Sequence, residues 1–362
     1  MFLTLAIILG LAVAYLIAAR RLDAPDHSQF DQPDYPLQKP ADAISAQHED
    51  TLAQLAAMHA EASPGQDVAQ ARERLEALFY REVRADTQIS PASADGVLGE
   101  WVIAAGANPA HRLLYVHGGA FRLGSPKSHR GLTEALSRLA GVAVLAIDYR
   151  KLPENKLRHC HEDTQTAYRW LLEHGPQGPL TGAAAGKLFV AGDSAGGNLA
   201  LAVSAWARDR GLPAPAAVVA MAPVTDGTFS SPSWRANSAS DAFLGPSVGR
   251  LLRIPRSALL IGARLTNGVA PNDPQISPLL GDLAGLPPTL IQVSRDEMLF
   301  DDARRYANKA RTMGSPVELQ VWPKLVHVFQ GFAPELPEAN EALAQIGTFL
   351  GEQLSAPASP DV

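Results

Sequence analysis

The sequence is poor in the residues that form covalent or metal crosslinks. It has one cysteine, Cys160, in 362 residues, which excludes an internal disulfide framework and a zinc site built from cysteines. Charged residues make up 19% of the chain, the net charge is -6, and no basic run with interleaved aromatics occurs, so no nucleic-acid partner is expected. The sequence also lacks a G-x-x-x-x-G-K-[ST] loop and an H-E-x-x-H motif, so it lacks the residues for phosphate-cradle and zincin chemistry.

Hydrophobic residues make up 46% of the chain, enough for the core of one large domain with additions. Apolar strand-like runs alternate with helical patterns, which predicts an α/β fold: a mostly parallel sheet with helices on both faces. The parallel strands are expected at 113–116, 142–147, 188–190, 217–221, 289–293 and 317–321. An antiparallel pair, 80–86 and 97–105, joined through Asp95-Gly96, completes eight strands.

Residues 2–19 form an uncharged stretch that ends at Arg20-Arg21. Eighteen helical residues just cross a hydrocarbon core of about 30 Å, so we expect residues 1–22 to be a transmembrane helix in contact with the lipid bilayer. The arginines favour a single-pass membrane protein whose main domain, after residue 22, lies in the cytoplasm. The alternative is a cleaved signal peptide and a secreted or periplasmic protein.

The rest of the chain divides by composition. Residues 23–40 contain four prolines and are predicted to be a linker. Helical patterns follow within 41–82, and the main domain is assigned to 83–354. The strand-helix rhythm fails after Thr225, where a long insertion is more typical of a lid than of a structureless loop. Residues 355–362 are predicted to be a disordered tail.

One stretch, Lys187 to Leu199, combines an apolar strand, the turn Gly-Asp-Ser-Ala-Gly and an Ala-rich helix. This pattern is typical of a nucleophile elbow, in which a strained turn exposes Ser194 at the start of a helix. Backbone N–H groups and the helix dipole there favour developing negative charge. Ser194 is therefore the candidate nucleophile.

A serine hydroxyl needs a base, and the base needs an orienting acid. His327 follows the last predicted strand and Asp296 follows the strand before it, so both should project from the same sheet edge as Ser194. We predict His327 as the base and Asp296 as the acid. Competing acids lie nearby, namely Glu297, Asp301 and Asp302; the last two suit the first turn of the next helix.

An acyl-transfer site also needs donors for the carbonyl oxygen that becomes negative. The loop His117-Gly-Gly-Ala-Phe121 follows the strand 113–116. We assign the N–H groups of Gly119, Ala120 and Ala195 to this oxyanion hole, with Gly118 setting the loop.

These motifs, in this order, resemble the bacterial hormone-sensitive-lipase family of carboxylesterases. The resemblance covers roughly residues 45–352 and rests on His117 to Phe121, Asp148 to Glu154, Gly192 to Gly197, Asp273-Pro274, Ser277 to Leu279, Asp296-Glu297 and His327. It implies an α/β-hydrolase fold with a helical cap built from residues 41–82 and the insertion 225–262. It also implies hydrolysis of short- to medium-chain acyl esters, with no metal and no organic cofactor. Ala120 stands where many members have a third glycine.

The expected function is therefore that of a serine carboxylester hydrolase acting on a small-molecule ester or lactone. Lactone hydrolysis or deacetylation by the same triad is the alternative, and a non-catalytic ligand-binding protein is a further one. An apolar pocket under the cap is predicted from Phe121, Leu123, Phe243, Leu244 and Val328, with Trp234 and Phe329 as further candidates that suit a core equally well.

Overall fold

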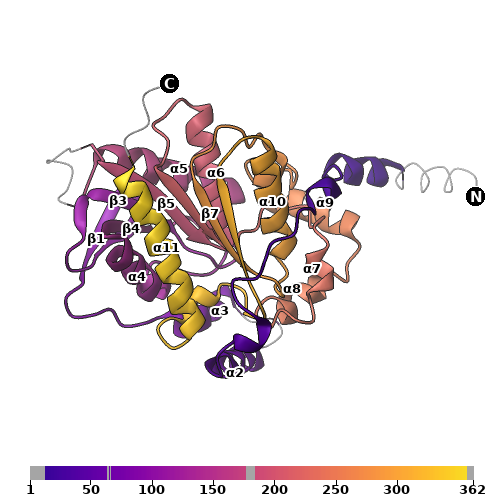
Figure 1. The fold of residues 1–362 in the computed structure, drawn as a ribbon. Helices are drawn as coiled ribbons and strands as arrows, with labels where there is room; N and C mark the ends of the chain where they lie inside the picture. The colour runs from indigo at the N-terminus through magenta and orange to yellow at the C-terminus, as the bar shows by residue number, and fades with distance from the viewer. Residues whose placement is uncertain (1–12, 63–64, 66, 177–183, 357–362) are drawn as a thin grey trace, which may run out of the picture.

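The computed structural model describes residues 13–62, 65, 67–176 and 184–356. Its centre is an eight-stranded sheet with the order β1-β2-β4-β3-β5-β6-β7-β8 (Figure 1). Strand β2 runs antiparallel to β1 and β4, and the other neighbours are parallel. The strands are β1 (Gln88–Ala94), β2 (Val97–Ile103), β3 (Asn108–Val116), β4 (Val142–Ile147), β5 (Lys187–Asp193), β6 (Ala217–Met221), β7 (Thr289–Ser294) and β8 (Val317–Trp322). The predicted α/β-hydrolase fold with a mostly parallel sheet is confirmed.

The first strand lies later in the chain than the sequence pattern predicted. Asp95 and Gly96 both have positive φ angles, 47° and 90°, as a two-residue hairpin turn requires. Ala94 therefore pairs directly with Val97, and the strand expected at 80–86 is instead β1.

Helices cover both faces of the sheet. The helices α4 (Arg130–Ala140) and α11 (Pro337–Ser355) pack on one face, and α5 (Leu157–Glu173), α6 (Ala195–Asp209) and α10 (Phe300–Thr312) pack on the other. In β3, Leu113 and Tyr115 join the first of these cores, whereas Leu114 and Val116 join the second. Because both faces are covered, the strand is apolar throughout, which made it recognisable in the sequence.

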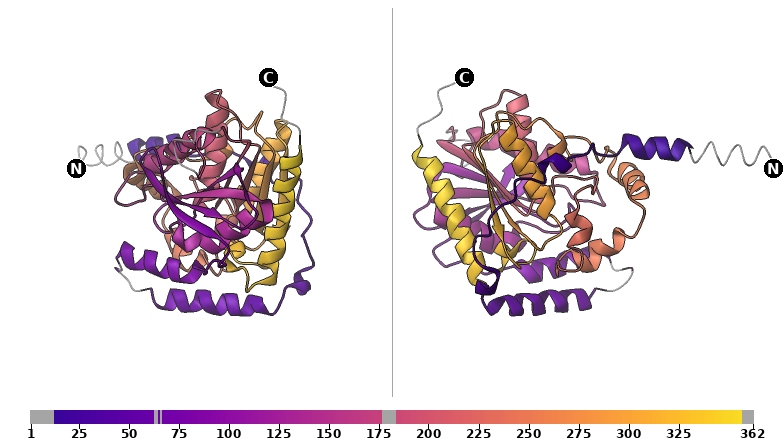
Figure 2. Two further views of the ribbon diagram at one scale, coloured as in Figure 1. Left: turned by 90° about the vertical axis from the view of Figure 1, so that its left-hand side faces the viewer. Right: turned by 45° about the vertical axis from the view of Figure 1, so that its right-hand side comes forward.

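Two further groups of helices lie outside these layers. The helices α2 (Gln47–Ala60) and α3 (Val68–Phe79) lie side by side beyond one end of the sheet (Figure 2). The insertion after β6 forms α7 (Ser233–Ala236), α8 (Gly245–Leu251) and α9 (Arg256–Asn267). The helices α2, α3, α7 and α8 lie in the segments that the sequence assigned to a cap, whereas α9 begins there and ends at Asn267, beyond residue 262.

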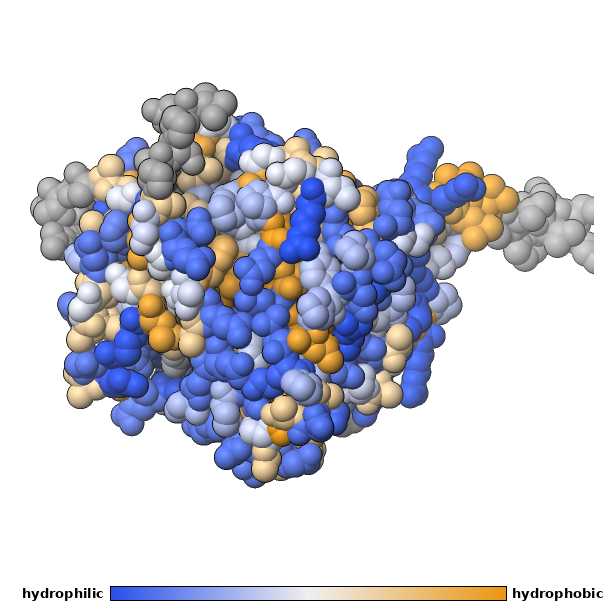
Figure 3. All heavy atoms as spheres, in the orientation of Figure 1, coloured by the Kyte–Doolittle hydropathy of each residue, from blue (hydrophilic) through white to orange (hydrophobic). Residues whose placement is uncertain are grey.

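The prediction of a transmembrane helix is corrected. In the part of the chain that the structure describes, no helix has both the length and the apolar character needed to cross a bilayer. The predicted single-pass membrane location is therefore not supported. The placement of the catalytic domain, which was derived from it, is not supported either. Residues 2–12 of the predicted span lie outside the described residues. Residues 13–21 are helical and carry exposed apolar side chains, visible beside the grey atoms in Figure 3.

The segment 23–40, interpreted from its composition as a linker, lies against the domain. Asp31 forms ion pairs with Arg304 and Arg305 of α10, with N–O distances of 3.4 and 2.6 Å. The Tyr35 hydroxyl donates to Asn308 Oδ1 at 2.7 Å, and the backbone of Gln38 bonds to Val321 of the edge strand β8. The segment therefore covers the free edge of the sheet, which otherwise exposes unpaired backbone groups.

The helix α2 is held to the domain by one fully buried leucine. Leu55 is 0% exposed and belongs to a cluster with Phe79, Phe329 and Phe332. We expect Leu55→Ala to lower the free energy of unfolding by about 2–5 kcal/mol, because the removed side chain leaves a cavity. Leu98→Ala is the control, since that side chain is 65% exposed and its loss should change stability by less than about 0.5 kcal/mol. Urea unfolding measures both; equal effects would contradict the packing of α2.

Candidate active site

Ser194 stands at a strained turn between β5 and α6. Its φ and ψ are 53° and -116°, a region that residues other than glycine rarely adopt and that is typically found at functional sites. The turn requires small neighbours: a Cβ on Gly196 would collide with the carbonyl of Val116. The sequence therefore aims the serine hydroxyl out of the sheet edge at the N-terminus of α6.

His327 joins Ser194 to a carboxylate. Its Nε2 lies 2.9 Å from Ser194 Oγ, and its Nδ1 lies 2.9 Å from Glu297 Oε1. His327 is 1% exposed and Glu297 is 0% exposed. The three side chains follow the carboxyl ends of β5, β7 and β8. Because these strands are parallel, those ends lie on the same side of the sheet.

The acid beside His327 is Glu297, not Asp296. Both residues follow β7, but Asp296 points toward the next loop, where its Oδ2 accepts the backbone N–H of Lys324 at 2.7 Å. Glu297 turns inward, and its second oxygen accepts the N–H of Ser294 at 2.9 Å. The prediction of Asp296 as the orienting acid is corrected, because successive side chains of the turn point in different directions.

Burial and mutual attraction set the pKa values of this pair. Burial alone would lower the pKa of His327, but the charge and hydrogen bond of Glu297, with Asp241 and Asp193 nearby, raise it above its ordinary value. Burial raises the pKa of Glu297, while His327 acts in the opposite direction. A carboxylate in this place favours the imidazolium that forms when His327 takes a proton.

The loop after β3 lies beside the serine. Gly118 N–H donates to Asp193 Oδ1 at 2.9 Å, so it sets the loop and is not available to a ligand. Among the described residues, no acceptor bonds the N–H groups of Gly119, Ala120 or Ala195. Such donors beside a serine suit an oxyanion, and the oxyanion-hole assignment stays a prediction.

Asp193 is a residue whose role the sequence analysis did not single out. It is 2% exposed, and its carboxylate also accepts the hydroxyl of Tyr115 at 2.5 Å and lies 3.4 Å from His129 Nε2. Burial acts to raise the pKa of Asp193, but His129 and Tyr115 hold it below its ordinary value. Asp193 thus ties the loop of Gly118 to the residue before the nucleophile. Its position inside the elbow motif was the available signal.

The predicted pocket residues differ in burial. Phe243 is the clearest member: its ring centroid lies 5.7 Å from that of His327 and 5.8 Å from that of Phe79. Val328 is 3% exposed, directly after His327. Phe121, Leu123 and Leu244 are partly buried, and each packs against a different core cluster. Trp234 and Phe329 are core residues, 5% and 1% exposed.

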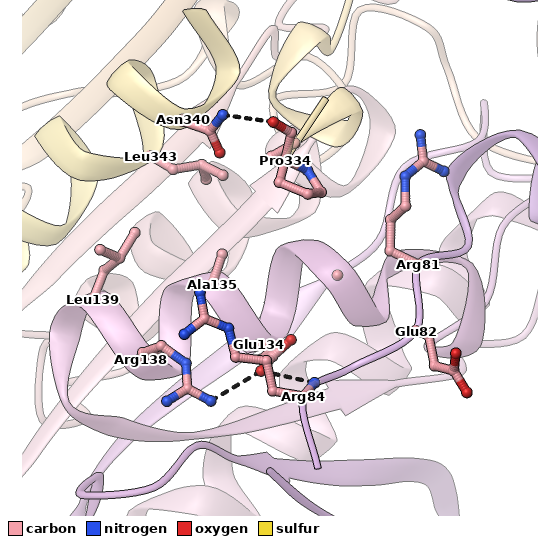
Figure 4. Close-up of a pocket in the computed structure, with 12 residues that line it drawn as sticks. Arg81, Glu82, Arg84, Glu134, Ala135, Arg138, Leu139, Pro334, Asn340 and Leu343 are labelled. Carbon is pink, nitrogen blue, oxygen red and sulfur yellow. Dashed lines mark hydrogen bonds and ion pairs between the residues drawn. The ribbon is translucent and has the colours of Figure 1, made fainter. Parts of the chain in front are cut away.

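A separate cavity of about 330 Å³ lies between α4 and α11 (Figure 4). Its lining includes Arg81 and Arg138, whose guanidinium groups pair with Glu335 and Glu134 at 3.0 Å. None of the residues around Ser194 lines it. We assign this cavity no role in the chemistry.

The His327–Glu297 contact predicts a measurable titration. We expect the pKa of His327, followed by NMR of its ring protons, to lie above 6.5 in the folded protein and to fall in Glu297→Gln, because the neutral amide no longer favours the imidazolium. Asp296→Asn should leave it nearly unchanged. An equal or larger fall in Asp296→Asn would contradict the assignment of the acid.

Known proteins share the fold of this chain. Residues 113–331 fit a family model described as the alpha/beta hydrolase fold. An acetyl-hydrolase of Streptomyces hygroscopicus is 41% identical over 252 residues, 69% of this chain and 78% of the relative. An esterase of Acinetobacter venetianus is 36% identical over 262 residues, 72% of this chain and 81% of the relative.

Solved structures agree with these relatives. The crystal structure of an esterase from the bacterial hormone-sensitive lipase family superposes with a TM-score of 0.75 at 35% identity, over 86% of this chain and all of the other. A crystal structure of EstE5 soaked with p-nitrophenyl butyrate superposes with a TM-score of 0.73 at 33% identity, with the same coverage. The chain therefore belongs to the α/β-hydrolase-fold family and, within it, to the bacterial hormone-sensitive-lipase family of carboxylesterases.

Proposed function

We propose that this protein is a serine carboxylester hydrolase in which Ser194 is the nucleophile, His327 the base and Glu297 the orienting acid. The observation that carries the proposal is the continuous contact from Ser194 Oγ through His327 to Glu297, with both distances at 2.9 Å. The free N–H groups beside the serine supply the second part of an acyl-transfer site. The names of the relatives, esterase and acetyl-hydrolase, support the same reaction class.

The geometry supports two proton-balanced half-reactions. In the first, His327 Nε2 takes the proton of Ser194 as Oγ bonds to the ester carbonyl, and the oxyanion accepts N–H groups from Gly119, Ala120 and Ala195. The intermediate collapses, the C–O bond to the alcohol breaks, and His327 returns the proton to that alcohol. In the second, His327 takes a proton from water as the water oxygen bonds to the acyl carbon. The acyl C–O bond to Ser194 then breaks, His327 returns the proton to Ser194 Oγ, and the carboxylic acid leaves.

The substrate side of the proposal is a short- to medium-chain acyl ester. Phe243, beside His327 and Phe79, gives the site an apolar aromatic wall. An apolar wall next to a small number of polar groups is typical of a site for small lipophilic substrates. The likeness to a structure soaked with p-nitrophenyl butyrate supports the same size class.

The acyl-enzyme predicts a kinetic burst. With p-nitrophenyl esters of graded chain length, the full-length protein should release about one equivalent of p-nitrophenol rapidly, with an optimum at short to medium chains. Ser194→Ala should lose the burst and reduce kcat by about 10⁶-fold. Steady turnover by folded Ser194→Ala would refute the nucleophile assignment.

The identity of the acid predicts different results for two neighbouring residues. Glu297→Gln should lower kcat by about 10³- to 10⁴-fold, whereas Asp296→Asn should change it by less than about threefold. Since the base must be neutral to accept a proton, kcat/KM in wild type should fall as the pH drops through a His327 pKa above 6.5. In Glu297→Gln the residual activity should persist to lower pH. The opposite ranking of the two variants would restore Asp296 as the acid.

A further inference from the structure

The loop that carries Glu297 is held by the insertion. Residues 295–299, called here the acid loop, connect β7 to α10. A short segment at residues 237–241, called here the cap turn, lies against them. Asn237 Nδ2 donates to the carbonyls of Arg295 and Glu297 at 2.9 and 2.8 Å. Ser240 Oγ donates to the carbonyl of Asp296 at 2.8 Å. Three successive carbonyls of the acid loop are thus bonded by two side chains of the insertion.

The fourth residue of the loop, Met298, is held through its N–H group and not through its carbonyl. The N–H of Met298 donates to Asp241 Oδ2 at 2.8 Å, and Asp241 is 2% exposed. The other oxygen of Asp241 accepts the N–H groups of Phe243 and Leu244 at 3.0 and 2.8 Å. One buried carboxylate therefore joins the acid loop to the segment that places the Phe243 ring beside His327.

Turns between a strand and a helix have no sheet or helix ladder to satisfy their backbone groups, so side-chain contacts decide their shape. Here those contacts come from a segment more than 50 residues earlier in the chain. The same segment bonds itself into a turn, because Asn237 O accepts the N–H groups of Ser240 and Asp241 at 3.2 and 2.9 Å.

We propose that the cap turn positions the catalytic acid: Asn237 and Asp241 hold the acid loop so that Glu297, rather than Asp296, points at His327. This inference rests on the proposed function. The insertion then has a role in the catalytic geometry besides covering substrate, and displacement of the cap turn weakens the His327–Glu297 contact. Asn237 and Asp241 are positioning residues, since they act through the backbone of the loop.

The chain offers a matched control for Asn237. Asn308 Nδ2 likewise donates to two backbone carbonyls, those of Phe30 and Pro33, at 2.9 and 3.0 Å. It holds the N-terminal segment and not the acid loop. Asn237→Ala and Asn308→Ala each remove an amide that donates to two backbone carbonyls, and Asn308→Ala also removes the acceptor of the Tyr35 hydroxyl. Neither changes the charge near His327, which faces Glu297, Asp241 and Asp193.

The experiment is a double-mutant cycle in the full-length protein, with each alanine variant made in wild type and in Glu297→Gln. We expect Asn237→Ala to lower kcat by about 10- to 100-fold with KM within threefold, the size of effect that a misplaced catalytic group produces. In the Glu297→Gln background it should add less than twofold, because the group it positions is already lost. Asn308→Ala should cost less than threefold in both backgrounds. Equal effects of the two asparagines, or an undiminished Asn237→Ala effect in Glu297→Gln, would overturn the proposal.

A second readout does not depend on turnover. The NMR pKa of His327 should fall in Asn237→Ala toward its value in Glu297→Gln and stay unchanged in Asn308→Ala; no fall in Asn237→Ala would refute the positioning role. If wild type hydrolysed no ester, the proposed function would be refuted, and this titration would still test the positioning role.

If Asn237→Ala does not fold, variants of two serines in the cap turn replace it. Ser240→Ala should lower kcat and the His327 pKa. Ser238→Ala should change neither, because within the described part of the chain its hydroxyl bonds only Arg235 O. Equal results would refute the proposal.

Discussion

The buried contact between His327 and Glu297 is the interaction on which the rest of the site depends. Two ionisable groups removed from water are stable only when they pair closely and their remaining polar atoms are satisfied. Close pairing requires that the backbone carrying each of the two groups be held in a fixed position. The sheet supplies it: β7 and β8 are parallel neighbours, with Ser294 opposite Trp322, so the loops that carry the acid and the base leave the same edge together.

Ser194, the proposed nucleophile, is held by a second buried group. Asp193 ends β5, directly before Ser194, and its carboxylate reaches back to the loop after β3. Since β3 and β5 are adjacent strands, the serine and the oxyanion donors share one support. A negative charge so close to a developing oxyanion would oppose catalysis if it were unpaired. On its other side the Asp193 carboxylate accepts the hydroxyl of Tyr115 and lies 3.4 Å from His129 Nε2.

Segments distant in sequence complete the frame. The N-terminal segment pairs with α10 through Asp31 and extends the sheet edge at β8, and the insertion holds the loop between β7 and α10. Both therefore act on the part of the fold that carries Glu297. The insertion also places Phe243 against His327, so substrate contacts and acid positioning arise from one short stretch of chain.

Local patterns in the sequence determined much of this protein. Apolar runs alternating with helical patterns predicted the sheet, and small residues around Ser194 predicted the elbow, because both depend on neighbouring residues and on allowed backbone angles. The His117 to Phe121 loop and His327 were recognisable for the same reason. The start of the first strand was not, since pairing across the Asp95-Gly96 turn sets it.

The choice between Asp296 and Glu297 lay outside the reach of the sequence. Both are acids after the same strand, and no local propensity separates them. Only the tertiary structure decided it: the Lys324 backbone draws Asp296 outward, and Asn237 and Asp241 hold the loop with Glu297 inward. Likewise, the proline-rich composition of residues 23–40 did not reveal that Asp31 binds α10. Contacts between residues far apart in the chain made these decisions, because a turn or an extended segment takes its shape from whatever satisfies its backbone and charges.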